Sequence, residues 1–465
     1  MSNSIHRKPP AKMQHGAALI VMLLLLVSGT LVLLISSLSG ARLQNVRAQT
    51  TADALTQAKS ALIAYATAVA LTPAGSKRPG NLPCPDINND GIAETACGNA
   101  SGSTGQNLRL GRLPWKTLGI EDLRDSSGER LWYAVSSNFK NNTAIPVLNS
   151  DTPGSITVRD TSGNISHNGC ITYGLPKCPQ PGSDDAAFGT GAVAVIIAPG
   201  AVLTRQTTGN PQDRSASGIN TSSNYLDVAT LNGITYDNQS FTDLSSTSGF
   251  IQGYIRHSNG DWILNDKLIV ISHDQLMSSV QKRVAAELKQ CLNEYAAADG
   301  SFGRYPWAAK LNPAAPVSYD DTSGTMFGRI PDNPFDSTLS DSNYQMNDTW
   351  MGNCNINSNS GWWLNWKESV FYGLADAYKP IPTPNDAASC GTCLSLSSSA
   401  SGNDKRFVVI VAGKKVTGQS RNNNADKGAP ANYLEGGNQN ADQSGGYTFT
   451  QAGFSGTFND TVVTP

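Results

Sequence analysis

The longest apolar run of the chain covers residues 17–38 and is followed by Arg42. A short leader precedes it and ends at Gly16, and its basic residues are Arg7, Lys8 and Lys12. At ~1.5 Å per residue, a helix over residues 17–38 is roughly 33 Å long, enough to cross the hydrocarbon core of a bilayer. The pattern predicts a transmembrane helix whose basic leader stays in the cytoplasm.

A weaker apolar pattern continues this helix. Between residues 51 and 71, small and apolar residues recur at steps of three and four: Leu55, Ala58, Leu62, Ala66 and Val69. Such a stripe predicts an amphipathic helix that buries one face against a sheet. Residues 275–298 repeat the pattern, whereas Thr72, Pro73 and the Gly/Pro-rich segment up to residue 83 predict the end of the first helix.

The rest of the chain predicts short strands with long polar loops. Residues 191–198 and 406–412 are apolar and rich in β-branched side chains, which is typical of central strands. The segments L-W-Y-A-V (131–135) and V-F-Y-G-L (370–374) are expected to be strands with a buried aromatic face. Core packing is the favoured role of six aromatic residues: Trp115, Trp132, Tyr133, Trp307, Phe371 and Tyr372. A sugar-binding platform is the alternative.

Five segments recur in the same order in the two parts of the chain. The pairs are 111–115 with 303–307, 131–135 with 370–374, 195–198 with 409–412, 224–227 with 432–435, and 265–266 with 459–460. Five collinear matches favour a tandem duplication over chance. We therefore expect a leader (1–16), a transmembrane helix (17–38), a first module (39–272) and a second module (273–465).

The N-terminal region resembles the class III signal of the type IV pilin superfamily. Its start, G-A-A-L-I-V-M-L-L-L-L from Gly16, is similar to that of the K-type minor pseudopilin of type II secretion and of the X-type minor pilin. The resemblance implies cleavage by a prepilin peptidase between Gly16 and Ala17, and N-methylation of Ala17. A secretory signal with a cleavage site near residues 37–41, or a plain signal anchor, are the alternatives.

Position five of the mature chain departs from most pilins. These have a glutamate there, which pairs with the N-terminal ammonium of a neighbour during assembly, whereas this chain has Val21. The resemblance then implies a subunit that needs no neighbour ahead of it, as at a filament tip. The motifs L-P-C-P-D-x-N-x-D-G and G-R-L-P-W-K-T-L-G-I are also similar to the heads of uncharacterised prepilin-type proteins. The implied fold class is α+β: a long transmembrane and amphipathic helix with two heads, each a helix on a small, mostly antiparallel sheet.

Eight cysteines, an even number, predict disulfides in an oxidising compartment. Local pairs are the simplest expectation in the first module, Cys84 with Cys97 and Cys170 with Cys178. In the second module, pairing Cys291 with Cys354 and Cys390 with Cys393 is one of three possibilities. The C-x-x-C spacing of Cys390 and Cys393 also fits a redox or zinc motif, but neither a thioredoxin pattern nor a second C-x-x-C accompanies it.

The loop between Cys84 and Cys97 carries oxygen ligands at alternate positions. Its candidate calcium ligands are Asp86, Asn88, Asp90, the carbonyl group of Ile92, and Glu94. Gly91 at the sixth position permits the sharp turn of a calcium loop. Cys97 occupies the twelfth position, where an EF-hand has a bidentate glutamate, so a shorter loop is expected. An Asx-rich turn held by the disulfide is the alternative.

Composition excludes several classes of function. Only 15% of the residues are charged and the net charge is −2, so the chain lacks the basic footprint of a nucleic-acid-binding protein. It contains no G-x-S-x-G, H-E-x-x-H or P-loop motif, and paired carboxylates such as Asp184 and Asp185 lie in polar loops. We therefore expect no enzymatic activity and no cofactor other than calcium.

The combined expectation is a minor pilin or pseudopilin at or near the tip of a type IV pilus or a type II secretion pseudopilus. Its partners would be the prepilin peptidase, other pilins and the inner membrane. The location expected is a single-pass inner-membrane protein with a cytoplasmic N-terminus, its heads periplasmic or on an extracellular filament. The alternative is an anchored adhesin that recognises a glycan or a secreted substrate.

Overall fold

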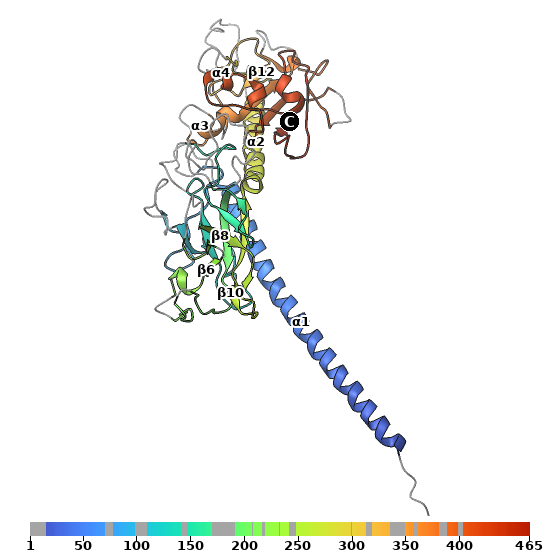
Figure 1. Ribbon diagram of the computed structural model, residues 1–465. Helices are drawn as coiled ribbons and strands as arrows, with labels where there is room; N and C mark the ends of the chain where they lie inside the picture. The colour runs from blue at the N-terminus through green and yellow to red at the C-terminus, as the bar shows by residue number, and fades with distance from the viewer. Residues whose placement is uncertain are drawn as a thin grey trace, which may run out of the picture. The chain divides into compact units, whose positions relative to one another are not determined.

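The structure is a computed structural model (Figure 1). It describes residues 15–69, 78–97, 109–140, 147–169, 191–206, 208–215, 219–231, 233–240, 248–298, 300–312, 319–334, 349–352, 354, 356, 361–380, 388–398 and 403–465. By contacts the chain divides into two units, Met1–Asp53 and Ala54–Pro465. We call residues 54–272 of the larger unit the first half and residues 273–465 the second half.

Helix α1 (His15–Ala68) is the longest described element and ends close to the predicted residue 71. In the part of it that belongs to the smaller unit, the apolar side chains from Leu19 to Val27 are all more than half exposed. Single exposed leucines are common on protein surfaces, but this continuous apolar surface is much larger than one side chain.

The predicted transmembrane helix of residues 17–38 is wrong. Within the described residues, no helix has an apolar stretch long enough to cross a membrane. The predicted single-pass inner-membrane location, with its cytoplasmic N-terminus, is overturned by the same finding.

Each half of the larger unit contains a four-stranded antiparallel sheet. In the first half its order is β1 (Leu110–Arg112), β2 (Trp132–Val135), β5 (Ala192–Ala198) and β11 (Lys267–Ser272). In the second half it is β12 (Phe327–Arg329), β13 (Val370–Leu374), β15 (Phe407–Val411) and β17 (Thr461–Val463). The two sheets therefore share one strand order.

Further strands surround these sheets. The first half also has β3 (Val158–Asp160), β4 (Ile165–His167), β6 (Val228–Leu231), β7 (Ile234–Asp237) and β8 (Ser248–Gln252), in the order β4-β3-β8-β7-β6, with β8 parallel to both its neighbours. Two small sheets pair β9 (Ile255–Arg256) with β10 (Trp262–Leu264), and β14 (Ser395–Leu396) with β16 (Thr448–Phe449), the latter in parallel.

The predicted fold class is therefore wrong. The described chain is mixed α/β with several small sheets and parallel strand pairs, not a transmembrane helix with two simple helix-on-sheet heads. The physical reason is that the segments between β2 and β11 form a second layer of strands on the first half. Their polar, Gly- and Asn-rich sequence gave too weak an alternation to predict it.

Strand β5 is buried on both faces, which explains its unbroken apolar sequence, A-V-A-V-I-I-A. Ile196 belongs to the large core that also contains Leu62 of α1 and Leu288 of helix α2. Ile197 belongs to a second core with Phe250 of the five-stranded sheet. Strand β5 thus lies between these two cores.

Helix α2 (His273–Ala297) begins directly at the end of β11. Ser272 is both the last residue of β11 and the N-cap of α2, where Ser272 and Gln275 form a capping box. The helix buries the predicted stripe: Leu276, Val280, Val284, Leu288, Leu292 and Tyr295. It packs against β15 and β17.

The remaining described helices are short, and all except the 3₁₀ turn Ser222–Asn224 lie in the second half. They are α3 (Trp363–Trp366), α4 (Asn424–Lys427) and the 3₁₀ turns Ser222–Asn224, Lys367–Ser369, Asp376–Tyr378, Pro430–Asn432 and Gly436–Asn440. The side chains of Trp362, Trp363 and Trp366 are fully buried there. The turns of the second half connect its strands, and these three tryptophans belong to the large core that contains Ile196 and Leu288.

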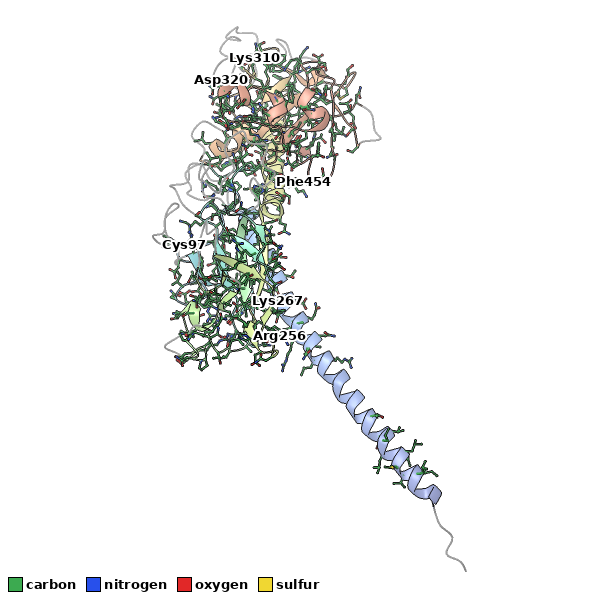
Figure 2. The ribbon with its side chains drawn as sticks, viewed as in Figure 1. Cys97, Arg256, Lys267, Lys310, Asp320 and Phe454 are labelled. Carbon is green, nitrogen blue, oxygen red and sulfur yellow. A yellow bond between two sulfur atoms is a disulfide. The ribbon has the colours of Figure 1, made fainter. Side chains whose placement is uncertain are left out.

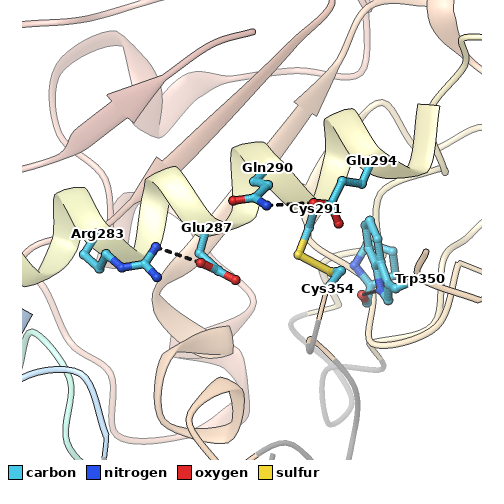
Figure 3. The surroundings of a disulfide bond; sticks show 8 residues. Arg283, Glu287, Gln290, Cys291, Glu294, Trp350 and Cys354 are labelled. Atoms are coloured by element: carbon cyan, nitrogen blue, oxygen red, sulfur yellow. Dashed lines mark hydrogen bonds and ion pairs between the residues drawn. A yellow bond between two sulfur atoms is a disulfide. The ribbon is translucent and has the colours of Figure 1, made fainter. Parts of the chain in front are cut away.

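Disulfides are present, as the sequence predicts. They join Cys84 to Cys97, Cys291 to Cys354 and Cys390 to Cys393, the pairs considered above. Cys170 and Cys178 lie outside the described residues. The bridge from Cys291 fixes the last turns of α2 to the segment around Trp350 (Figure 3). The ring of Trp350 meets that of Tyr295 edge to face.

Candidate functional site: two matching networks of buried polar residues

Matching tyrosines occupy the second strand of each four-stranded sheet. The hydroxyl of Tyr133 donates a hydrogen bond to the carbonyl oxygen of Pro83 at 3.1 Å, and that of Tyr372 donates to Pro306 at 3.2 Å. Both rings are completely buried, and burial raises the pKa of each phenol well above its usual value. Pro306 is therefore the structural counterpart of Pro83.

This correspondence corrects one of the five sequence matches. The sequence pairs residues 303–307 with 111–115, but in the structure they correspond to residues 80–84. The backbone N–H of Gly80 donates to Ala66 at 3.0 Å, and that of Gly303 donates to Ala296 at 3.1 Å. Both residues thus bond back to the end of the preceding helix.

The true counterpart of β1 is β12, with the sequences L-G-R and F-G-R. A Cβ atom on Gly111 would lie 2.7 Å from the carbonyl oxygen of Asp86, and one on Gly328 would lie 2.0 Å from that of Ala309. Only glycine fits at these contacts between strand and loop. The motif G-R-x-P occurs at 111–114, 303–306 and 328–331, so pattern matching alone chose the wrong pair.

The arginine of each motif begins a stack of alternating arginine and tyrosine side chains. In the first half, the guanidinium carbons of Arg112 and Arg214 lie 4.0 and 5.1 Å from the ring centre of Tyr225. In the second half, Arg329 and Arg421 lie 4.4 and 4.2 Å from the ring centre of Tyr433. Cation–π contacts of this kind gain strength where water is excluded.

A network of buried polar side chains adjoins the first stack. Oδ2 of Asp266 accepts hydrogen bonds from the backbone N–H of Asp227 at 2.8 Å and from Nδ2 of Asn238 at 3.1 Å. The carboxylate of Asp227 accepts from the backbone N–H of Asn265 at 2.8 Å and from Nε2 of Gln212 at 2.9 Å. Two carboxyl groups therefore belong to one buried cluster.

The second half repeats this network bond for bond. Oδ2 of Asp460 accepts from the backbone N–H of Glu435 at 3.0 Å and from Nδ2 of Asn438 at 3.1 Å. The carboxylate of Glu435 accepts from the backbone N–H of Asn459 at 3.0 Å and from Nε2 of Gln419 at 2.9 Å. Glutamate thus replaces aspartate at one position without changing the partners.

Each network also contains one arginine with an outer carboxylate partner. Nη1 of Arg214 lies 3.1 Å from Oε1 of Glu129, and Nη1 of Arg421 lies 2.8 Å from Oδ2 of Asp151. Arg214 donates to the glutamine Gln212 at 2.9 Å, as Arg421 does to its own glutamine at 3.1 Å. The arginine charge is thus shared between the buried cluster and a carboxylate nearer the surface.

Burial dominates the electrostatics of the acid pairs. It raises the pKa of Asp227 to about 6 and that of Asp266 well above the usual carboxyl range, and the neighbouring charge of Asp227 raises the latter further. In the second half, burial raises the pKa of Glu435, and burial followed by the charge of Glu435 raises that of Asp460 well above its usual value. Desolvation of charged carboxylates is the cause in both halves.

The sequence comparison finds only part of these networks. It pairs residues 224–227 with 432–435 and 265–266 with 459–460, but it assigns them no role. It misses Gln212 and Arg214 because the first half has a longer loop there, which left Gln206 as the apparent match of Gln419. The signal that could have found them is Q-x-R, present at 212–214 and at 419–421.

The predicted calcium loop forms a tight turn. Backbone N–H groups of the loop donate hydrogen bonds to both carboxylate oxygens of Asp86. Oδ1 of Asp86 accepts from the N–H of Asn89 at 2.6 Å, and Oδ2 accepts from the N–H of Gly91 at 2.7 Å. Asn88 accepts from the N–H of Asp90 at 2.9 Å, and Asp90 accepts from that of Ile92 at 2.7 Å. The structure thus brings these predicted ligands into one turn.

Cationic side chains also contact this turn. Lys116 donates to the carbonyl oxygen of Asp90, and Arg130 donates to the carbonyl oxygen of Asn89. Glu94 accepts from the N–H of Ile87 at 3.4 Å. Among the described residues, no group of three histidine, cysteine or acidic side chains is placed to hold a metal ion. Calcium binding stays a prediction for this loop.

The predicted processing and assembly residues lie at the start of α1. Gly16 and Ala17 belong to its first turn, and Val21 lies within the exposed apolar stretch with 56% of its surface accessible. The backbone is thus helical through the position where a peptidase would cut. Of the six aromatic residues expected in the core, Trp115 alone is only partly buried.

A cleft of about 660 Å³ lies beside the first turns of α2. Its lining includes Lys282, Lys414 and Lys415, and the partly exposed ring of Phe454, which projects near the start of α2 (Figure 2). Asp274 lines it as well and pairs with Lys414 at 2.9 Å. The lining thus has more positive than negative side chains and one accessible aromatic ring.

Comparison with protein-family models, curated proteins and solved structures finds no match to the chain.

Proposed function

We propose that the protein is a structural subunit of a pilus-like filament, of the type IV pilus or type II secretion pseudopilus class. The observation that carries this proposal is the exposed apolar stretch of α1 from Leu19 to Val27. An apolar helix surface of this kind requires a cover, and side-by-side packing with helices of other subunits would provide one. The pilin-like sequence around Gly16 supports the same assignment.

The position of Val21 supports a place at or near the tip. Without a carboxylate there, the helix offers no partner for the N-terminal ammonium of a subunit ahead of it. Two halves with separate sheets also make a large head for a repeated shaft subunit. We infer that these halves arose by tandem duplication, supported by their common strand order and by their matching networks.

Processing after Gly16 provides the direct test. In cells that carry a prepilin peptidase, the wild-type chain should lose residues 1–16, and Gly16→Val should accumulate as the uncut precursor. Intact-mass measurement distinguishes the two forms. An unchanged mature mass for Gly16→Val would contradict peptidase processing at this position.

Assembly is tested separately with the apolar stretch. The triple change Leu19→Ser, Leu23→Ser and Leu26→Ser should abolish co-purification with other minor pilins. Leu43→Ser is the matched control, because Leu43 is a comparably exposed leucine of α1 beyond that stretch. Equal loss of co-purification in the control, or none in the triple variant, would count against assembly through residues 19–27.

A binding role is the second candidate, favoured by the cleft beside α2. Its excess of lysine side chains fits an anionic ligand, and the accessible ring of Phe454 fits stacking on a sugar face. We expect the full chain to bind an acidic polysaccharide such as alginate, and Lys282→Gln with Lys415→Gln to weaken binding at least tenfold. Lys379→Gln, outside the cleft, is the control; a salt-insensitive titration, or equal weakening by the control, would argue against this role.

A further inference from the structure

The two acid pairs contain buried oxygen atoms that no hydrogen-bond donor reaches. Oδ1 of Asp266 and Oδ1 of Asp460 are both buried without a partner, although Oδ2 of each accepts two hydrogen bonds. An ionised carboxylate with one bare oxygen is costly to bury. Because the same atom lacks a partner in both halves, the arrangement is a property of the network.

A proton on Oδ1 of Asp266 and of Asp460 removes the cost of burying a charged carboxylate there. A carboxylic acid carries one O–H donor, and the other carboxylate of the pair, whose charge acts on it, is an acceptor in the same network. The positive charge available is limited, because Arg214 is already shared with Glu129, and Arg421 with Asp151. The other contacts come from amide and backbone N–H groups, which favour the ionised form of one carboxylate but cannot neutralise two.

The position of the acids gives the proton a structural role. Asp266 directly precedes β11, and Asp460 directly precedes β17, so each stands at the start of the last strand of its sheet. Their partners, Asp227 and Glu435, follow the tyrosine of the arginine–tyrosine stack. The pair therefore connects the last strand of each sheet to the loop that carries the stack.

We propose that each network holds one shared proton, carried on Oδ1 of Asp266 and of Asp460, and that it acts as a pH-sensitive lock on the last strand of each sheet. Loss of the proton places two negative charges side by side in a buried site. The strand and the loop then separate or admit water. The inference is independent of the filament proposal, since it concerns only the two halves.

The direction of the pH effect follows from the raised pKa values. A carboxyl group whose pKa is higher in the folded than in the unfolded chain binds its proton more tightly when folded. Its contribution to stability is complete below the unfolded pKa of about 4. It is lost as the pH rises through about 6 for Asp227, and as the pH rises through the raised pKa values of Asp266 and Asp460.

Infrared spectroscopy of the full chain at pH 7 tests the proposal directly. The wild-type protein should show the carbonyl absorption of protonated carboxylic acids at a pH where exposed carboxyl groups are ionised. Asp266→Asn and Asp460→Asn should each remove about half of this absorption, and the double variant should remove nearly all of it. Asp213→Asn, at an exposed carboxyl group, should leave it unchanged.

The asparagine variants are chosen to fold. The amide keeps one acceptor for the two donors and offers an N–H in place of the acid O–H, so each variant reproduces the protonated state. Hydrogen exchange of β11 and β17 should accelerate at least tenfold between pH 6 and pH 9 in the wild type, beyond the intrinsic change, and much less in the double variant. Absence of the neutral-acid absorption at pH 7, or identical pH dependence in the double variant, overturns the proposal.

Discussion

The two halves of the larger unit share one buried network but complete it differently. In the first half, Arg214 pairs with Glu129, a residue of the same half. In the second half, the matching Arg421 pairs with Asp151, which belongs to the first half. The network of the second half is therefore completed by a residue from outside it.

Neighbouring contacts strengthen this dependence. Asp151 also accepts the backbone N–H of Lys415 at 2.9 Å, and Ser150 donates to the carbonyl oxygen of Ala412 at 2.6 Å. Asn365 accepts the N–H of Leu148 at 2.6 Å. The segment 147–151 thus supports the second half at several positions. The comparison teaches that two similar halves need not be equally self-sufficient.

Disulfide removal should give the largest loss of stability, and the loss should be larger in the second half. The Cys291–Cys354 bridge closes a loop of 63 residues and the Cys84–Cys97 bridge one of 13 residues. The loop-entropy relation gives about 4 kcal/mol for the first and about 3 kcal/mol for the second. Denaturant unfolding of the two Cys→Ala double variants measures both; a larger loss from the shorter loop would contradict this ranking.

Truncating the buried acids should cost about 3 kcal/mol in either half. Asp266→Ala or Asp460→Ala leaves two buried donors unpaired, each worth about 1–3 kcal/mol. Chemical unfolding of each variant provides the measurement, with Asp266→Asn as the milder control. A loss below 1 kcal/mol in one half only would show that its network is dispensable, and the two halves would then differ in their cores as well as at their junction.

Removing the outer carboxylates isolates the dependence of the second half on the first. Asp151→Ala should lower the free energy of unfolding by about 2 kcal/mol, because Asp151 holds both Arg421 and the N–H of Lys415. Glu129→Ala should cost less than about 1 kcal/mol, since its ion pair with Arg214 is more exposed. Hydrogen exchange should show the Asp151 variant loosening residues 413–421. Protection unchanged there would disprove the dependence.

Calcium should give the smallest effect and act on the first half alone. The second half has Ala309 where the first has Asp86, and it lacks the carboxylate that organises the turn. If the turn binds calcium, a tenfold excess over the dissociation constant should stabilise the protein by about 1.4 kcal/mol. Thermal unfolding with and without calcium measures this, and Asp90→Ala should remove it. No shift for the wild type would leave the turn purely structural.

Local patterns predicted the elements whose burial is simple. The stripe of α2 has one buried face, and β5 and β15 are buried throughout, so period and composition sufficed. The five-stranded sheet was missed because strands such as β4, I-S-H, are short, polar and exposed. Their position depends on pairing with distant strands, which a single sequence does not encode locally.

In the sequence, the polar networks were visible only as short repeated motifs. The match of Asn265 and Asp266 with Asn459 and Asp460 marked the right residues, but nothing in it indicated that the acids are buried beside a second carboxyl group. Burial of a polar residue results from tertiary packing. The transmembrane prediction failed for a different reason: it used hydropathy over residues 17–38, whereas no helix of the described residues is long and apolar enough to span a membrane.

Ser272 ends the last strand of the first half and caps the first turn of the second, so no hinge residue stands between them. Leu62, Ile196, Leu288 and Val409 of the two halves also share a single core. A force applied to one sheet is therefore transmitted directly to the other. The junction between the two halves resists bending, and it offers a protease no linker at which to separate them.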